Sequence, residues 1–229
     1  ETEGGAYYFE QPTPGRENRE GTALIAPTPA VLTAPGVYNG VSSLSVEVTG
    51  TGTLHYTTDG RTPTENDPIY SAPLTFTTTT TLRVASFEEG KLKSDVLTAN
   101  YVINEGHTLP VLCLTADPEA LLGQDGIYHQ NLPYDEEILC NLCLFEDSGS
   151  FCIDGGLEMM ATGTAYPEKK SMKVNFRGQY GADVLGYPVF GQDGPLVFDA
   201  LCLQANAEQN MTLFRDELFS QLCLEMTEV

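Results

Sequence analysis

The sequence contains no tryptophan, and its 11 lysines and arginines stand against 32 aspartates and glutamates, which gives a formal net charge of −21. The phosphates of nucleic acid or of an anionic membrane would repel such a chain, so we expect no nucleic-acid partner. No hydrophobic run approaches the roughly 20 residues of a membrane-spanning helix, so we expect no membrane insertion. The first residues, ETEGGAYYFEQPTPG, are typical of the interior of a longer protein and contain no signal peptide.

Cysteine is absent from the first 112 residues of the chain, and all six cysteines lie between Cys113 and Cys223. Cys140 and Cys143 have the C-x-x-C spacing that suits zinc or redox chemistry. Residues 138–145, however, have the pattern of a strand, on which residues three apart point to opposite faces, so we expect no metal site. The apolar neighbours of each cysteine favour buried free thiols, and disulfides are the alternative in an oxidising compartment.

The first part of the chain divides into a tail and an all-β region. Residues 1–26 are rich in Gly, Glu and Pro, which is typical of a linker or of the end of a preceding domain. From residue 27 to 104, short alternating runs are separated by Gly, Pro, Asn and Asp. Several short strands at this spacing predict a β-sandwich. The runs are residues 43–48, 52–57, 81–86 and 97–103.

The most specific stretch of this region is YTTDGRTPT at residues 56–64, followed by Ile69-Tyr70 and a Thr-rich strand at 77–84. It resembles the chitobiase/β-hexosaminidase C-terminal-type domain. The resemblance implies an immunoglobulin-like sandwich that serves as a spacer or accessory module in secreted proteins, and hence an extracellular or cell-surface location. His55 and Tyr56 are candidates for a carbohydrate platform. Because the chain has no tryptophan, we favour a structural role for both.

From residue 105 onward the sequence pattern differs from that of the all-β region, because it combines strand and helix signals. Residues 109–114 predict a buried strand, and Asp117-Pro118 begins a short helix that ends at Gly123. Residues 138–145 and 150–153 predict a hairpin, and residues 195–204 a further strand. Apolar residues every four positions predict a helix at 212–226. These residues are Phe214, Leu218, Leu222 and Met226.

One short stretch, residues 163–181, holds four of the eleven basic residues. Residues 171–177 alternate between apolar and polar, which predicts a half-buried strand with one polar face. A basic strand in an acidic protein suggests a docking place for an anion such as phosphate, and an ordinary solvated face is the alternative. The basic residues are Lys169, Lys170, Lys173 and Arg177.

Several short motifs of this half resemble, in their order, the CotH kinase family of atypical kinase-fold proteins. The resemblance implies a partial kinase-like α+β lobe over residues 105–229 and, for a full-length parent, ATP-dependent phosphoryl transfer to protein hydroxyls with Mg or Mn. The motifs are Leu109-Pro110-Val111, Gly126-Ile127-Tyr128, Gly155-Gly156-Leu157, Lys170-Ser171-Met172-Lys173-Val174 and Arg215-Asp216.

A kinase amino-terminal lobe uses a strand lysine to hold the nucleotide phosphates and a helix acid to position that lysine. The resemblance makes Lys170 the candidate lysine, Lys173 the reserve and Glu217 the candidate acid. The alternatives are an ordinary surface lysine and an exposed helix charge. The family's catalytic and metal-binding aspartates lie beyond its Arg-Asp helix, and no G-x-G-x-x-G loop is present. We therefore expect no catalytic and no metal residue within this chain, and no phosphorylation by it alone.

The expected fold is mainly β with some α, arranged as residues 1–26, 27–104 and 105–229. The expected function is that of a fragment of a secreted or cell-surface CotH-type kinase with protein substrates. The alternative is a non-enzymatic adhesion, spacer or carbohydrate-associated module. A glycoside hydrolase fragment would need paired carboxylates in a groove, and no such pair stands out among the 32 acids.

Overall fold

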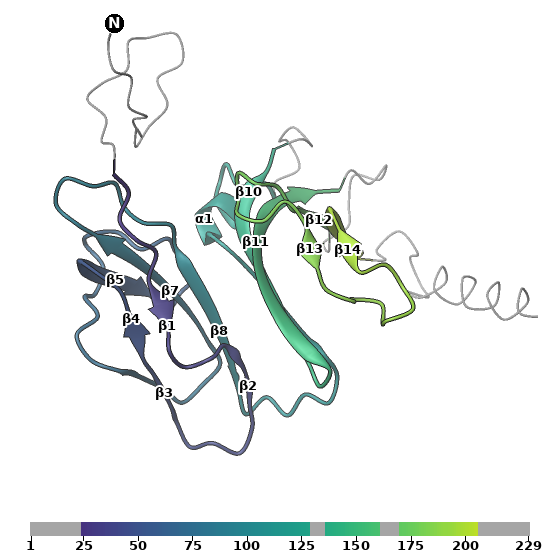
Figure 1. Ribbon diagram of the computed structural model, residues 1–229, viewed down its shortest axis with the longest axis horizontal. Coiled ribbons are helices and arrows are strands. Elements are labelled where there is room, and N and C mark those ends of the chain that lie inside the picture. The colour runs from purple at the N-terminus through teal and green to yellow at the C-terminus, as the bar shows by residue number, and fades with distance from the viewer. Residues whose placement is uncertain (1–23, 129–135, 161–169, 206–229) are drawn as a thin grey trace, which may run out of the picture. The chain divides into compact units, whose positions relative to one another are not determined.

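The computed structural model describes residues 24–128, 136–160 and 170–205, which are mostly strand (Figure 1). The elements of the first part are β1 Ala30–Val31, β2 Gly36–Tyr38, β3 Leu44–Val46, β4 Val48–Thr49, β5 Thr53–Thr57, β6 Leu74–Phe76, β7 Thr80–Phe87 and β8 Leu97–Ile103. Those that follow are β9 Val111–Ala116, α1 Pro118–Leu122, β10 Ile138–Glu146, β11 Gly149–Met159, β12 Met172–Asn175, β13 Leu185–Gly186, β14 Val197–Phe198 and β15 Ala200–Leu203.

The first eight strands form the predicted sandwich. One layer is a four-stranded sheet of order β2-β8-β7-β5, in which β2 and β8 are parallel and the other pairs antiparallel. The other layer consists of the antiparallel pairs β3-β6 and β1-β4. All four runs that the sequence predicted as strands are confirmed, with residues 43–48 divided between β3 and β4.

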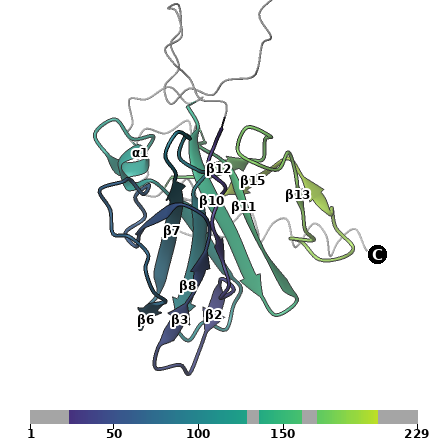
Figure 2. The same ribbon diagram turned by 60° about the vertical axis from the view of Figure 1, so that its left-hand side comes forward.

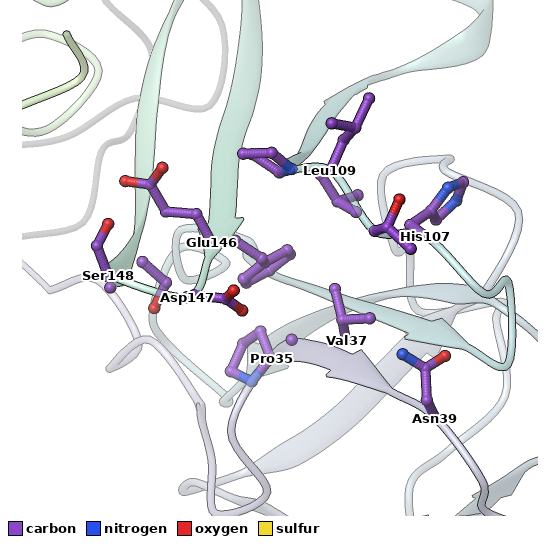
Figure 3. A pocket seen from close by; sticks show the side chains of 15 residues that line it. Pro35, Val37, Asn39, His107, Leu109, Glu146, Asp147 and Ser148 are labelled. Atoms are coloured by element: carbon purple, nitrogen blue, oxygen red, sulfur yellow. The ribbon is translucent and has the colours of Figure 1, made fainter. Parts of the chain in front are cut away.

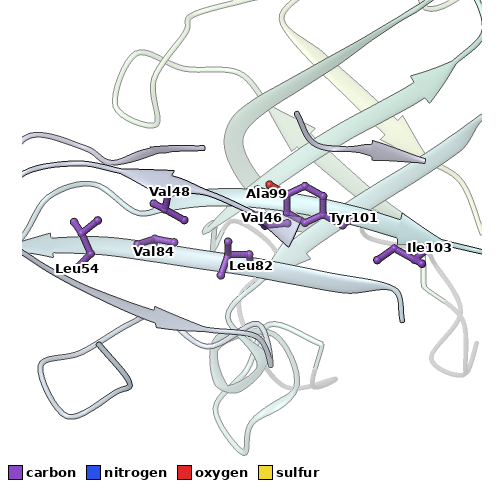
Figure 4. Close-up of a cluster of buried hydrophobic side chains, with 8 residues drawn as sticks. All are labelled: Val46, Val48, Leu54, Leu82, Val84, Ala99, Tyr101 and Ile103. Atoms are coloured by element: carbon purple, nitrogen blue, oxygen red, sulfur yellow. The ribbon is translucent and has the colours of Figure 1, made fainter. Parts of the chain in front are cut away.

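The core of the sandwich lies between these layers (Figure 4). Leu82 and Val84 of β7 and Tyr101 of β8 are fully buried there, opposite Val46 of β3. These side chains occupy alternate positions, because successive residues of a strand point to opposite faces. The Tyr101 hydroxyl donates a hydrogen bond of 2.9 Å to the Thr33 carbonyl, which satisfies the polar group of this core ring.

The second sheet has the order β15-β12-β11-β10-β9, and β13 and β14 form a separate short ribbon. The predicted hairpin is present, and β11 extends to Met159, so that residues 155–159 belong to the strand rather than to a connection. The basic strand is confirmed as β12. Its neighbours β11 and β15 (Figure 2) are both antiparallel to it. Lys173 lies opposite Glu158 on β11 and Cys202 on β15.

The chain divides into two compact units. The first comprises Glu1–Asp117 with Cys143–Phe151, and the second Pro118–Leu142 with Cys152–Val229. The tip of the β10-β11 hairpin thus belongs with the sandwich and β9. No helix within the described ranges is long and apolar enough to cross a membrane.

One expectation about the second half is corrected. The strand predicted as buried at 109–114 runs from Val111 to Ala116 and lies at the edge of its sheet, since β10 is its only partner among the described strands. Leu112 is accordingly 44% exposed. The short helix after Asp117 is confirmed as α1, and Gly123 donates to the Glu119 carbonyl at its end. The helix predicted at 212–226 lies outside the described residues.

The expectation of free, buried cysteines is wrong in part. Cys143 and Cys152 are disulfide-bonded, and Cys202 is a free but exposed thiol. Cys140 does fit the expectation: burial, with a smaller contribution from the Asp154 carboxylate, raises the pKa of its thiol to about 12. The apolar flanks of the cysteines predict burial but cannot separate a free thiol from a disulfide, because both are accommodated in apolar surroundings.

Candidate functional site

The polar face of β12 carries basic side chains that are already paired with acids. Lys173 Nζ lies 3.0 Å from Glu158 Oε1 on the neighbouring strand. Arg177, just after the strand, places Nη2 2.8 Å from Glu137 Oε1. Lys173 and Arg177 therefore each have a carboxylate partner, and the anion site that the basic sequence suggested stays a prediction. These ion pairs stabilise the sheet, each by a modest amount at a partly exposed position.

Glu137 is the centre of this face. Its side chain is only 10% exposed, and besides Arg177 it accepts hydrogen bonds from Asn175 Nδ2 at 2.9 Å and from the Tyr180 hydroxyl at 3.0 Å. Burial, together with the nearby Glu137 carboxylate, raises the pKa of the Tyr180 hydroxyl. Gly156 makes room for the cluster, because a Cβ there would lie 2.5 Å from Glu137 Oε2.

Gly155 and Gly156 of β11 therefore allow close packing of the neighbouring residues. A Cβ on Gly155 would come within 2.8 Å of the Val174 side chain and 2.9 Å of the Asn175 carbonyl oxygen. Both glycines lie within a paired strand and let β12 and the Glu137 cluster approach closely.

Lys170 has different surroundings from Lys173. It lies two residues before β12, is half-buried, and its Nζ donates a hydrogen bond of 2.5 Å to the Tyr128 carbonyl oxygen. The same Nζ lies 5.1 Å from the centroid of the Tyr128 ring, and the Lys170 backbone N–H donates to the Tyr128 hydroxyl at 3.2 Å. Within the ranges that the structure describes, Lys170 forms no ion pair with a carboxylate.

Tyr128 is itself held by α1. Its backbone N–H donates to the Leu121 carbonyl, and that of Ile127 to the Ala120 carbonyl, so the segment turns back over the end of the helix. Ile127 is 5% exposed and anchors this turn. Two motifs separated by more than forty residues, Gly126-Ile127-Tyr128 and Lys170-Ser171, thus meet at one place.

Of the predicted site residues, the structure therefore locates two. Lys170 contacts Tyr128, and Lys173 pairs with Glu158 on the polar strand face. Glu217, the candidate acid, lies outside the described residues. Sequence reasoning missed Glu137, since an acid in the run Asp135-Glu136-Glu137 is not distinguished by its neighbours. It included Tyr128 in the motif Gly126-Ile127-Tyr128 but assigned it no role. Among the described residues no group of three or more His, Cys, Asp or Glu side chains could hold a metal ion.

The YTTDGRTPT stretch of the sandwich forms a loop that is held by hydrogen bonds and ion pairs among its own and adjacent residues. Arg61 Nε lies 2.7 Å from Asp59 Oδ2, and this hydrogen bond lowers the pKa of the Asp59 carboxyl. The Asp67 carboxylate accepts from the Thr64 backbone at 2.8 Å and its hydroxyl at 2.7 Å, which lowers the pKa of Asp67. Gly60 adopts a φ of +85°, a conformation that favours glycine. The motif therefore specifies a turn.

The proposed carbohydrate platform is part of the packed sandwich. His55 is 6% exposed, its Nδ1 lies 2.7 Å from the Asp67 carbonyl oxygen, and its ring meets Phe87 edge to face. Tyr56 packs against the sandwich core. Both therefore have the structural role that the sequence favoured.

The first unit also contains an open groove of about 810 Å³ (Figure 3). Pro35 and Val37 of the β2 region form its floor, and Glu146 and Asp147 of the hairpin turn line one side. His107 and Leu109 line the other, and Leu109 is 78% exposed. The groove combines acids, hydroxyls and small apolar surfaces, a lining that suits a polar, hydroxyl-bearing ligand better than an anion.

Comparison with known proteins recognises the sandwich. A family model described as the chitobiase/β-hexosaminidase C-terminal domain matches residues 33–98. The match covers the YTTDGRTPT stretch and most of the sandwich strands, from before β2 into β8. No curated protein and no solved structure matches the chain.

Proposed function

We propose that this chain joins an accessory β-sandwich to the amino-terminal lobe of a CotH-type kinase domain, in which Lys170 binds the phosphates of a nucleotide. In the full-length parent, this lobe would serve ATP-dependent phosphoryl transfer to protein hydroxyls with Mg or Mn. The parent would be secreted or exposed at the cell surface, the setting in which such a sandwich accompanies a catalytic domain.

The observation that carries the proposal is the contrast between two lysines three residues apart. Lys173 is committed to Glu158, whereas Lys170 is held by a carbonyl oxygen and an aromatic ring. A neutral carbonyl and a ring face orient an ammonium group without neutralising its charge. The charge of Lys170 therefore remains available for an anion, and a strand lysine is the group that kinases use for nucleotide phosphates.

The elements around Lys170 also suit a nucleotide-binding lobe. Lys170 lies two residues before β12, a strand that is paired on both sides, and its own backbone N–H is bonded to the Tyr128 hydroxyl. Tyr128, which fixes the ammonium group, is bonded to the end of α1. A phosphate contact of this kind needs such support, because precise positioning of the charge is most of what a kinase contributes.

Calorimetric titration of the chain with ATP and Mg or Mn tests the proposal. We expect Lys170→Ala to weaken binding by about tenfold or more, since a hydrogen bond to a charged group is worth about 1.5–3 kcal/mol. Lys173→Ala is the matched control and should bind within about twofold of the original chain. Equal losses in both variants, or binding that survives in Lys170→Ala, would contradict the assignment.

The family match favours a second candidate, a non-enzymatic accessory module associated with carbohydrate. The groove beside the hairpin turn offers its surface, because carboxylates and hydroxyls there can bind sugar hydroxyls. Titration with soluble oligosaccharides tests this candidate, with Asp147→Ala as the variant expected to reduce binding. Oligosaccharide binding without nucleotide binding would favour the accessory module over the kinase lobe.

A further inference from the structure

Strands β7 and β8 are buried on both faces. Leu82, Val84 and Tyr101 point into the sandwich core. The residues between them point away from it, and a two-layer antiparallel sandwich commonly leaves that face in water. Here that outer face is as buried as the core: its members are Arg83 (4% exposed), Ala85 (0%), Thr98 (9%), Asn100 (3%) and Val102 (4%).

Asn100 shows what covers this face. Its Oδ1 accepts hydrogen bonds from Thr81 of β7 at 2.7 Å and from Thr115 of β9 at 3.2 Å. Its Nδ2 donates to Cys143 Sγ of β10 at 3.6 Å. Thr115 and Cys143 are themselves buried, at 9% and 0% exposure. One buried amide therefore links the sandwich to two strands of the second sheet through neutral hydrogen bonds.

A second contact lies at the other end of the same face. Arg83 Nη1 donates a hydrogen bond of 2.8 Å to the Gly60 carbonyl, which holds the DGRTPT loop against β7. The Thr62 backbone N–H in that loop donates a hydrogen bond of 2.9 Å to Oδ2 of Asp117, the residue immediately before α1. The family-specific loop of the sandwich thus reaches the residue that precedes the helix. Every residue of both contacts belongs to the first unit.

We infer that the outer face of β7 and β8 is an intramolecular docking surface for β9 and the Cys143–Phe151 part of the hairpin. On this inference the sandwich is required for the folding of β9 and the hairpin tip, and is not a detachable spacer. Buried polar groups such as those of Asn100 and Thr115 are costly to leave without partners, so each side of the surface stabilises the other. The inference does not depend on the kinase proposal.

The connecting residues offer a direct test, because residues 104–110 are all exposed. A protease recognition sequence inserted between Glu105 and Leu109 allows the folded full chain to be cut at this one place. Cys143 and Cys152 both lie after the cut, and no cysteine precedes it, so no disulfide can hold the two fragments together. We expect the cut fragments to co-elute in gel filtration as a one-to-one complex. Separate elution of two folded fragments would overturn the inference.

A matched pair of variants locates the surface. Asn100→Ala should weaken the association of the cut fragments at least tenfold, whereas Asn66→Ala, at an exposed asparagine of the same sandwich, should leave it unchanged. Unaltered association in Asn100→Ala would contradict the role of this amide. If Asn100→Ala does not fold before cutting, the cut original chain still decides whether the sandwich and the second half hold together.

Discussion

Strands β7 and β12 have similar alternating sequences and different surroundings. On β7 the polar positions are as buried as the apolar ones, and Arg83 bonds to a backbone carbonyl. On β12 the apolar Val174 is buried, whereas Lys173 on the other face stays partly exposed and pairs with Glu158. Alternation therefore identifies the two faces of a strand. It does not tell whether the polar face meets water, carboxylates or another part of the chain.

The first prediction, with the largest expected effect, concerns the core face of β7. Leu82→Ala removes a fully buried side chain from the core face of β7 and should lower the free energy of unfolding by about 2–5 kcal/mol, because it leaves a cavity. Urea unfolding followed by tyrosine fluorescence and circular dichroism measures the change. Leu32→Ala, at a leucine that is 67% exposed, is the control and should change stability by less than about 0.5 kcal/mol. A loss below about 1 kcal/mol in Leu82→Ala would contradict the described core.

The second prediction concerns the polar face beside β12. Glu137→Ala removes the acceptor of the buried Asn175 amide and the partner of Arg177, and should cost about 1–3 kcal/mol of unfolding free energy. Glu136→Ala, at the exposed neighbouring acid, is the control and should have almost no effect. Equal stability of the two variants would show that Glu137 is not the centre of this face.

The third prediction uses pH. Burial raises the pKa of Tyr101 well above its usual value of about 10, so the folded state holds this proton more tightly than the unfolded chain. Its contribution to stability is complete below pH 10 and is lost as the pH rises toward the folded-state pKa. Tyr101→Phe also loses the bond to the Thr33 carbonyl, about 0.5–1.5 kcal/mol at neutral pH.

Unfolding measured at pH 8 and pH 11 checks this expectation. Between these values the original chain should lose more stability than Tyr101→Phe, which has no phenol to ionise at this position. Tyr180→Phe sharpens the comparison, because Tyr180 also has a raised pKa but is only partly buried, so its removal should reduce the pH dependence less. A steeper loss of stability in Tyr101→Phe than in the original chain would refute the assignment.

Much of the fold could be predicted because strands and turns leave local patterns. The longer sandwich strands, α1 and the β10-β11 hairpin followed from alternation, capping residues and glycine, whereas the short strands β1, β2 and β6 did not. The disulfide state of Cys143 could not be predicted, because apolar neighbours suit a free thiol and a disulfide alike. The burial of Asn100 could not be predicted either, since its partner Cys143 is more than forty residues away in the sequence. For the same reason the meeting of Lys170 with Tyr128, across more than forty residues, was invisible until the fold brought them together.

The smallest expected effect is the most useful for function. Lys173→Ala breaks a partly exposed ion pair with Glu158, and such pairs contribute about 0.2–1 kcal/mol. Its free energy of unfolding in urea should therefore stay within about 1 kcal/mol of the original chain. This near-neutrality is what qualifies the variant as the control for Lys170→Ala, since a change in nucleotide affinity can then be separated from a loss of folded protein. A loss of several kcal/mol in Lys173→Ala would instead show that the ion pair is essential to the stability of the sheet. The contrast between Lys173, which is paired with Glu158, and Lys170, which is not paired with an acid among the described residues, would then be tested with Lys173→Met, which keeps most of the side-chain volume.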